Sequence, residues 1–251
     1  MNKKNEPKIG KKSKTKRRKP SLPGVIVRVL LLAILTFVVS SVLLVGLLRF
    51  YPPPTSAFMV KRQVDGLFQQ SKSPRIHYQW TDWEFISPHM ALAVVAAEDQ
   101  QFPLHRGFDF QSISEALEER RTKGRVRGAS TITQQTAKNL FLWEGRSFAR
   151  KGVEAWFAVL IEALWPKRRI LEIYLNIVEF GDGVYGVRSA AMVFFDKEPS
   201  QLTRSEAALM AAVLPNPKRF SVVAPSGYMQ QRTRQIERQM NNLGGAYLRN
   251  L

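Results

Sequence analysis

The chain has 251 residues, of which 45% are hydrophobic, and this is enough apolar sequence for one large folded domain with an appendage. Its formal net charge of +18 is concentrated at the start, because residues 1–20 contain ten Lys or Arg and one acid. No cysteine is present, so disulfide bonds and thiolate metal sites are excluded.

The first predicted element is a membrane anchor. Residues 29–48 carry no charged side chain and consist mostly of Leu, Val and Ile. In a helix, a stretch of this length can cross the roughly 30 Å hydrocarbon core of a bilayer, whereas the apolar region of a cleaved signal peptide is usually shorter. Basic residues flank a first helix on its cytoplasmic side, so the tail at 1–24 indicates topology rather than nucleic-acid binding.

Beyond residue 50 the pattern predicts one mainly helical domain. Ser87 followed by Pro88 is typical of a helix start, and the nearly unbroken apolar run from 90 to 97 indicates a buried helix. Further helices are predicted from Asp109 to about 121, from a capping box at 131–134, at 148–165, at 169–180 and from 203 to Pro215. Strand signals are weak, and the best candidates are 76–85 and 220–223.

Glu98 and Asp99 lie where the apolar helix ends, just before the chain-turning residues Pro103 and Gly107. A carboxylate at such a position loses hydration and meets the negative end of the helix dipole, and both effects raise its pKa. This favours a general acid or base, although an isolated glutamate of this kind is more often a solvated helix end. His105 is expected to hydrogen-bond within this loop rather than to bind a metal.

Two later segments carry polar and basic side chains at helical spacing. Thr131, Gln135 and Lys138 project from one helix face that suits a sugar or a phosphate, or else is simply an exposed polar face. Arg150 and Glu154, four residues apart at the start of an apolar helix, form either a surface salt bridge or part of a site. With Glu98, they fit a two-carboxylate site for a phosphate-bearing substrate, for which glycosidases offer the nearest template.

Five blocks in this order resemble the peptidoglycan glycosyltransferase family, the lipid II polymerases found alone or fused to penicillin-binding domains. The blocks are EDQQFPLHRGFD at 98–109, GASTITQQTAKN at 128–139, RKGVE at 150–154, ILEIYLN at 170–176, and SEAALMA at 205–211 followed by PNPK at 215–218. The resemblance extends over about 53–220. No penicillin-binding module follows, so the chain resembles the monofunctional, membrane-anchored members.

The resemblance implies a mainly α fold, with a single N-terminal transmembrane helix and a two-lobed, lysozyme-like helical catalytic domain that has a small membrane-proximal lobe. The expected organisation is a basic cytoplasmic tail at 1–24, an anchor helix at 25–49, a Pro-rich spacer and the start of the catalytic domain at 50–75, a glycosyltransferase domain at 76–225 and a C-terminal helical extension at 226–251.

The reaction that the resemblance implies is polymerisation of lipid II into glycan strands, with β-1,4 linkages formed by inversion and undecaprenyl diphosphate released. Glu98 matches the family's general base on the acceptor 4-hydroxyl, and Glu154 matches a second catalytic carboxylate that serves the departing diphosphate. The matching substrate-binding residues are Asp99, Phe102, His105, Thr131, Gln135, Lys138 and Arg150. No cofactor is obligatory, and a divalent cation such as Mg²⁺, bridging Glu154 and the diphosphate, is an option.

The expected partners are lipid II, the growing lipid-linked strand and the membrane, with cell-division or cell-wall assembly proteins as further candidates. The expected location is the cytoplasmic (inner) membrane, crossed once, with the catalytic domain on the periplasmic or extracytoplasmic side. Two alternatives stay open. A lysozyme-like glycan-cleaving enzyme would need no diphosphate site, and in a non-catalytic scaffold of cell-wall assembly both Glu98 and Glu154 would be replaceable.

Overall fold

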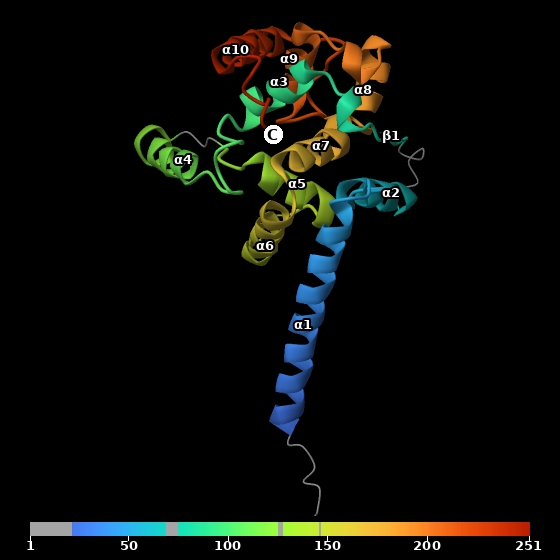
Figure 1. Cartoon of the computed structure of the whole chain (residues 1–251), viewed down its shortest axis with the longest axis vertical. Helices are drawn as coiled ribbons and strands as arrows, with labels where there is room; N and C mark the ends of the chain where they lie inside the picture. The colour runs from blue at the N-terminus through green and yellow to red at the C-terminus, as the bar shows by residue number, and fades with distance from the viewer. Residues whose placement is uncertain (1–21, 69–74, 125–127, 146) are drawn as a thin grey trace, which may run out of the picture. The chain divides into compact units, whose positions relative to one another are not determined.

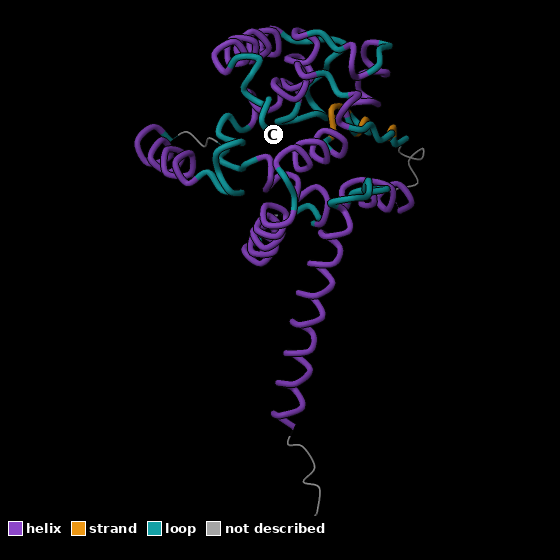
Figure 2. The backbone as a smooth tube through the Cα atoms, in the orientation of Figure 1, coloured by secondary structure: helices purple, strands orange, loops and turns teal. Residues whose placement is uncertain are grey.

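The computed structural model describes residues 22–68, 75–124, 128–145 and 147–251. Its elements, in chain order, are α1 (Leu22–Leu48), α2 (Ala57–Phe68), β1 (His77–Tyr78), η1 (Trp83–Phe85), α3 (Pro88–Glu98), α4 (Phe110–Lys123), α5 (Ile132–Phe141), α6 (Phe148–Leu164), α7 (Lys167–Ile177), β2 (Glu179–Gly181), β3 (Val184–Tyr185), α8 (Val187–Phe195), η2 (Pro199–Gln201), α9 (Arg204–Val213) and α10 (Gly227–Leu243). The prediction of a mainly α fold is confirmed, and the strands are few and short among the described residues (Figure 2).

Helix α1 is the predicted anchor. From Pro23 to Leu48 it is long and apolar enough to cross a membrane. Large apolar side chains along it, among them Leu32 and Leu35, are exposed in the structure. Contacts divide the chain after Ser41, so that residues 1–41 and 42–251 form two separate units. An exposed apolar helix of this length fits a single-pass membrane anchor.

The helices of 42–251 pack as two groups (Figure 1). In the first, α3 packs against α9 and α10, which also pack against each other. In the second, α5 packs against both α6 and α7, and α2 contacts α5. Helix α3 is buried on every side from Met90 to Ala96, which explains its unbroken apolar sequence. The C-terminal end of α3 and the N-terminal end of α5 come from different groups and meet through polar side chains.

The predicted helix starts are confirmed by capping geometry. The Ser87 hydroxyl accepts from the N–H of His89 at the start of α3, and Asp109 accepts from an N–H of α4. Thr131 and Thr203 each begin a helix with a reciprocal capping box. These capping motifs satisfy backbone N–H groups that have no partner within the helix. Each motif extends over only about three residues, so the local sequence is enough to specify it.

The predicted helix at 169–180 is wrong at its C-terminal end. Helix α7 stops at Ile177, and Glu179–Gly181 instead forms β2. Strand β3 lies in the middle of a small sheet, antiparallel to β2 and parallel to β1. Pairing with β3 satisfies the backbone of β2 and overrides the local helical preference.

The strand predictions were too long. Within 76–85 the strand is confined to His77–Tyr78, and Trp83–Phe85 is a short 3₁₀ turn. The segment 220–223 forms no strand. The glycine-rich stretch 181–186 contains the turn between β2 and β3, then β3 itself, and leads into α8.

Replacing Gly186 with Ala should destabilise the fold by about 2–3 kcal/mol. Gly186 has φ 81° and ψ 151°, a region that only glycine occupies without strain. An added Cβ would also lie 2.5 Å from the carbonyl oxygen of Asn176. Thermal unfolding of the detergent-solubilised protein measures the effect. Gly227→Ala is the control, because a Cβ there meets no described atom within 4 Å, and equal melting temperatures for the two variants would contradict the prediction.

Candidate active site

Glu98 is the last residue of α3, and two consecutive side-chain hydrogen bonds, through Gln135 to Tyr174, hold its carboxylate in place. Its Oε2 accepts a hydrogen bond of 2.8 Å from Nε2 of Gln135 on α5. Oε1 of Gln135 in turn accepts from the hydroxyl of Tyr174, at 3.0 Å. Tyr174 is fully buried on α7, and because the Glu98 carboxylate only accepts hydrogen bonds, the Gln135 amide turns its NH₂ group toward Glu98 and its oxygen toward Tyr174. The amide therefore presents a donor, and not an acceptor, to Glu98.

The environment of Glu98 raises its pKa. The main cause is burial, which disfavours the charged carboxylate, and the neighbouring charge of Asp99 adds to the rise. The Gln135 hydrogen bond and the positive charges of Arg232 and Lys138 act in the opposite direction. The direction agrees with the expectation from the sequence. A carboxyl group with a raised pKa can take up and release a proton closer to neutral pH.

Asp99 is buried and connects three segments. Its carboxylate accepts from Nε2 of His105 at 2.9 Å and from the backbone N–H of Ile132, the first residue of α5, also at 2.9 Å. The N–H of Gly107 donates to Nδ1 of His105, so the neutral ring carries its proton on Nε2. His105 fixes the loop after Glu98, as predicted. Asp99 thereby holds the end of α3 against the positive N-terminal end of α5.

Phe102 and Thr131 support the same loop. Phe102 is fully buried and meets the His105 ring edge-on, with the centroids 6.2 Å apart. The Thr131 hydroxyl donates to the carbonyl of Gly107 at 2.7 Å and accepts from the N–H of Gln134. Both hydrogen-bonding roles of Thr131 are thus used within the protein. In this structure the two residues position their neighbours.

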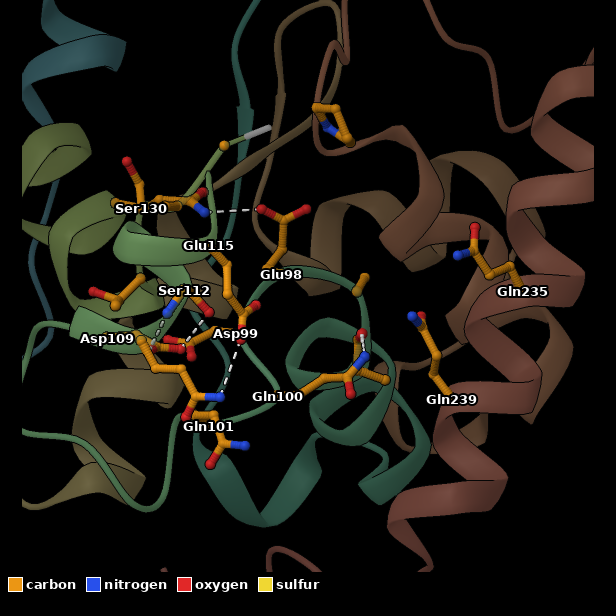
Figure 3. Close-up of a pocket in the computed structure, with 18 of the residues that line it drawn as sticks. Glu98, Asp99, Gln100, Gln101, Asp109, Ser112, Glu115, Ser130, Gln235 and Gln239 are labelled. Atoms are coloured by element: carbon orange, nitrogen blue, oxygen red, sulfur yellow. Dashed lines mark hydrogen bonds between the residues drawn. The ribbon is translucent and has the colours of Figure 1, made fainter. Parts of the chain in front are cut away.

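A cavity of about 720 Å³ lies beside Glu98 (Figure 3). Glu98, Asp99, Thr131 and Gln135 belong to its lining, together with residues of α4 and α10. The lining is rich in carboxylate, amide and hydroxyl groups. Its volume is typical of sites for small organic ligands, and this polarity suits a sugar.

The remaining predicted residues, Lys138, Arg150 and Glu154, form a second cluster with Lys151, which we call the basic cluster. Nη1 of Arg150 donates to Oε2 of Glu154 at 3.1 Å, and Lys151 pairs with its other oxygen. Glu154 is buried, so this is no surface salt bridge. Arg150 Nε is also buried and has no hydrogen-bond partner among the described atoms. That N–H group is therefore an unsatisfied donor within the cluster.

Lys138 connects the two parts of the site. Burial lowers the pKa of Lys138, with the charges of Arg150 and Lys151 acting in the same direction. The charges of Glu154 and Glu98 oppose this effect, so Lys138 interacts with both carboxylates. The face predicted from Gln135 to Lys138 therefore extends from the cavity to the basic cluster.

The residues around Glu154 do not form a metal centre by themselves. Among the residues that the structure describes, no three His, Cys, Asp or Glu side chains come together in a way that could hold a metal ion. Both Glu154 oxygens already accept from cationic side chains. A divalent cation there would need most of its ligands from a substrate.

Sequence reasoning missed Tyr174 and Arg232. Tyr174 is in a motif block but carried no assigned role, because its hydroxyl is reached through a third residue. Arg232 comes from α10, in the segment expected to be a C-terminal extension, yet it lines the cavity beside Glu98. No local pattern identifies it, since its role depends on the packing of α10 against α3.

Comparisons with known proteins show the family of this chain. Residues 66–241 match the family model described as transglycosylase. A protein of Xylella fastidiosa named biosynthetic peptidoglycan transglycosylase is 52% identical over 222 residues, which cover 88% of this chain and 91% of the relative. A protein of Shigella boydii with the same name is 57% identical over 202 residues, covering 80% and 84%. One of Xanthomonas campestris is 51% identical over 218 residues, covering 87% and 89%. The chain therefore belongs to the transglycosylase family.

Proposed function

We propose that this chain is a peptidoglycan glycosyltransferase that polymerises lipid II into glycan strands. The family match and the shared name of its relatives support this reaction class. The observation that carries the proposal is the pairing of a buried, hydrogen-bonded glutamate beside a sugar-sized cavity with a basic cluster that can accept a diphosphate. A glycan-cleaving enzyme releases no diphosphate, so it would have no use for the basic cluster.

Glu98 acts as the general base in this proposal. Its carboxylate takes the proton of the acceptor 4-hydroxyl, and the oxygen attacks the anomeric carbon of the donor. The bond from that carbon to the diphosphate breaks, and its electron pair leaves with the diphosphate. Attack from the face opposite the leaving group inverts the anomeric centre and gives a β-1,4 linkage. Burial supports the assignment, because the raised pKa of Glu98 strengthens it as a base.

The basic cluster serves the leaving group. Negative charge develops on the diphosphate as the glycosidic bond breaks, and fixed cations stabilise charge where it appears. Arg150 and Lys151 are held in place by the buried carboxylate of Glu154. The Arg150 guanidinium, whose Nε has no partner among the described atoms, and the desolvated Lys138 ammonium are suited to bind phosphate oxygens. Glu154 then acts mainly by positioning these cations.

The membrane fits the same proposal. The basic residues before α1 favour a cytoplasmic N-terminus, which puts the domain after α1 on the extracytoplasmic side of the inner membrane. Trp143, which precedes α6, and Phe148, its first residue, expose 58% and 100% of their surface. Trp favours the bilayer interface, and the exposed Phe adds apolar surface beside it. Both substrates carry lipid tails, so a catalyst held at the bilayer meets them at high local concentration.

The full chain in detergent, supplied with purified lipid II, should produce long glycan strands and release undecaprenyl diphosphate. Product length on a gel and the mass of the released lipid measure the two outcomes. A preparation that shortens preformed glycan, and leaves lipid II intact, would instead support the glycan-cleaving enzyme. A folded protein inactive in both assays would support the scaffold.

A further inference from the structure

The turn that carries Glu98 and Asp99 is held from outside by two C-terminal side chains. Nη2 of Arg232 donates to the carbonyl oxygen of Ala97 at 3.0 Å. The hydroxyl of Tyr247 donates to the carbonyl oxygen of Gln100 at 2.6 Å. These two carbonyls lie on either side of Glu98 and Asp99 in the sequence. The two contacts therefore enclose the turn.

The last carbonyls of a helix have no partners within it, so something else must satisfy them. At the end of α3, Val95 accepts from the N–H of Asp99, and Ala96 accepts from the side chain of Gln100. These bonds are local. Ala97 instead depends on Arg232, and a cation there also complements the negative end of the helix dipole. Long-range contacts thus complete the helix end beside the proposed base.

Both donors are well placed to hold the turn. Nη1 of Arg232 donates to Gln235 one turn further along α10, which limits the rotamers of the guanidinium. Helix α10 packs against α3 and α9, and its buried side chains include Ile236 and Met240. Tyr247 belongs to the segment after α10, which packs against the core together with Leu248 and Leu251. Tyr247 lies beyond residue 241, where the family match ends.

We propose that Arg232 and Tyr247 form a C-terminal clamp, a pair of positioning residues that hold the Glu98 carboxylate in its working geometry. The proposal rests on the proposed function, in which Glu98 is the general base. Neither residue needs to touch substrate for this role. A base must lie within hydrogen-bond reach of the proton it removes, so a shift of its backbone by a fraction of an ångström lowers the rate.

The two members of the clamp should differ in their effect on pH dependence. The charged groups that influence Glu98 are Asp99 beside it, Lys138 on α5 and Arg232 on α10, and Tyr174 faces it from α7. Arg232 lowers the pKa of Glu98, whereas the Tyr247 contact adds no charge. Glu98 works unprotonated, so kcat/KM falls as pH drops through its pKa. Without the Arg232 charge, that acid limb should move to higher pH.

The test compares Arg232→Met, Arg232→Lys and Tyr247→Phe in the full chain, with lipid II as substrate over a range of pH. Arg232→Met should lower plateau kcat about tenfold and move the acid limb up by about half to one pH unit. Arg232→Lys should return the acid limb to its wild-type pH because lysine keeps the positive charge. Tyr247→Phe should lower kcat about two- to tenfold and leave the limb unmoved. Arg238→Met and Tyr228→Phe, at exposed positions of α10, are the matched controls and should behave as wild type.

A second measurement does not depend on activity. Amide hydrogen exchange of the segment 97–105 should be faster in Tyr247→Phe and Arg232→Met than in the controls, and unchanged elsewhere in the domain. Native exchange together with a native pH profile in both variants would overturn the clamp. So would a tenfold loss in Arg232→Met that Arg232→Lys does not recover and that leaves the limb in place. If Glu98→Gln proves fully active, the proposed base fails instead, and the exchange data still decide whether the contacts hold the turn.

Discussion

Glu98→Gln should lower kcat for lipid II polymerisation by about two orders of magnitude or more, which is the range for loss of a general base. The substitution keeps the size of the side chain and its ability to accept from Gln135 through the amide oxygen. It removes the negative charge and the capacity to take a proton. Because burial disfavours a charge at this position, the neutral amide should fold at least as stably as the native glutamate. A loss of activity would therefore report on chemistry.

Two further readouts sharpen the Glu98 result. The residual activity of Glu98→Gln should lack the acid limb of the wild-type profile, since the group that titrates there is gone. Binding of lipid II, measured under conditions without turnover, should stay near the wild-type level. Glu118→Gln is the control, because Glu118 is 67% exposed on α4 and pairs weakly with Arg121. Wild-type activity in Glu98→Gln would rule out the assignment of the base.

Capped helix starts and the end of α3 were the parts of the fold and site that could be predicted best. The start of α3 at Ser87 and its end at Glu98 follow from a cap, a proline and an apolar run, all within about a dozen residues. The same local signals located the capping box at Thr131 and hence the Gln135 face of α5. The sequence even indicated the direction of the Glu98 pKa, since burial of the helix it ends was evident from composition.

Long-range contacts could not be predicted in the same way. The antiparallel pairing of β2 with β3 ends α7 early, and nothing in the local pattern after Ile177 requires a strand. The Thr131 hydroxyl donates to the carbonyl of Gly107, 24 residues away in the chain, and no local pattern indicated this contact. Arg232 and Tyr247 reach the turn of Glu98 across separations of 135 and 147 residues. Such contacts depend on how helices pack, which spacing alone does not reveal.

Glu154→Gln should reduce the polymerisation rate about 10- to 100-fold, mainly by weakening departure of the diphosphate. The substitution leaves Arg150, Lys151 and Lys138 close together without the buried carboxylate that orients them. Repulsion among the three cations should then move them away from the positions where charge develops on the leaving group. Removing one fixed donor at such a position typically lowers kcat by about two to three orders of magnitude. Rates measured with and without Mg²⁺ would show whether an added cation restores part of the lost stabilisation of the departing diphosphate. An unchanged rate at every Mg²⁺ concentration would contradict the role.

A double variant separates the positioning of cations from simple stability. Breaking a buried ion pair by removing one partner costs about 3–5 kcal/mol, and part of this returns when the other partner is removed too. Arg150→Met combined with Glu154→Gln should therefore melt at a higher temperature than Glu154→Gln alone. If the cluster binds the diphosphate, the double variant should nonetheless be the less active of the two, because a further cation is lost. The control is Glu144→Gln, which removes an exposed partner 3.5 Å from Lys61. It should leave the melting temperature near the wild-type value and change the activity by no more than about twofold. Activity that rises with the recovered stability would assign Glu154 a purely structural role.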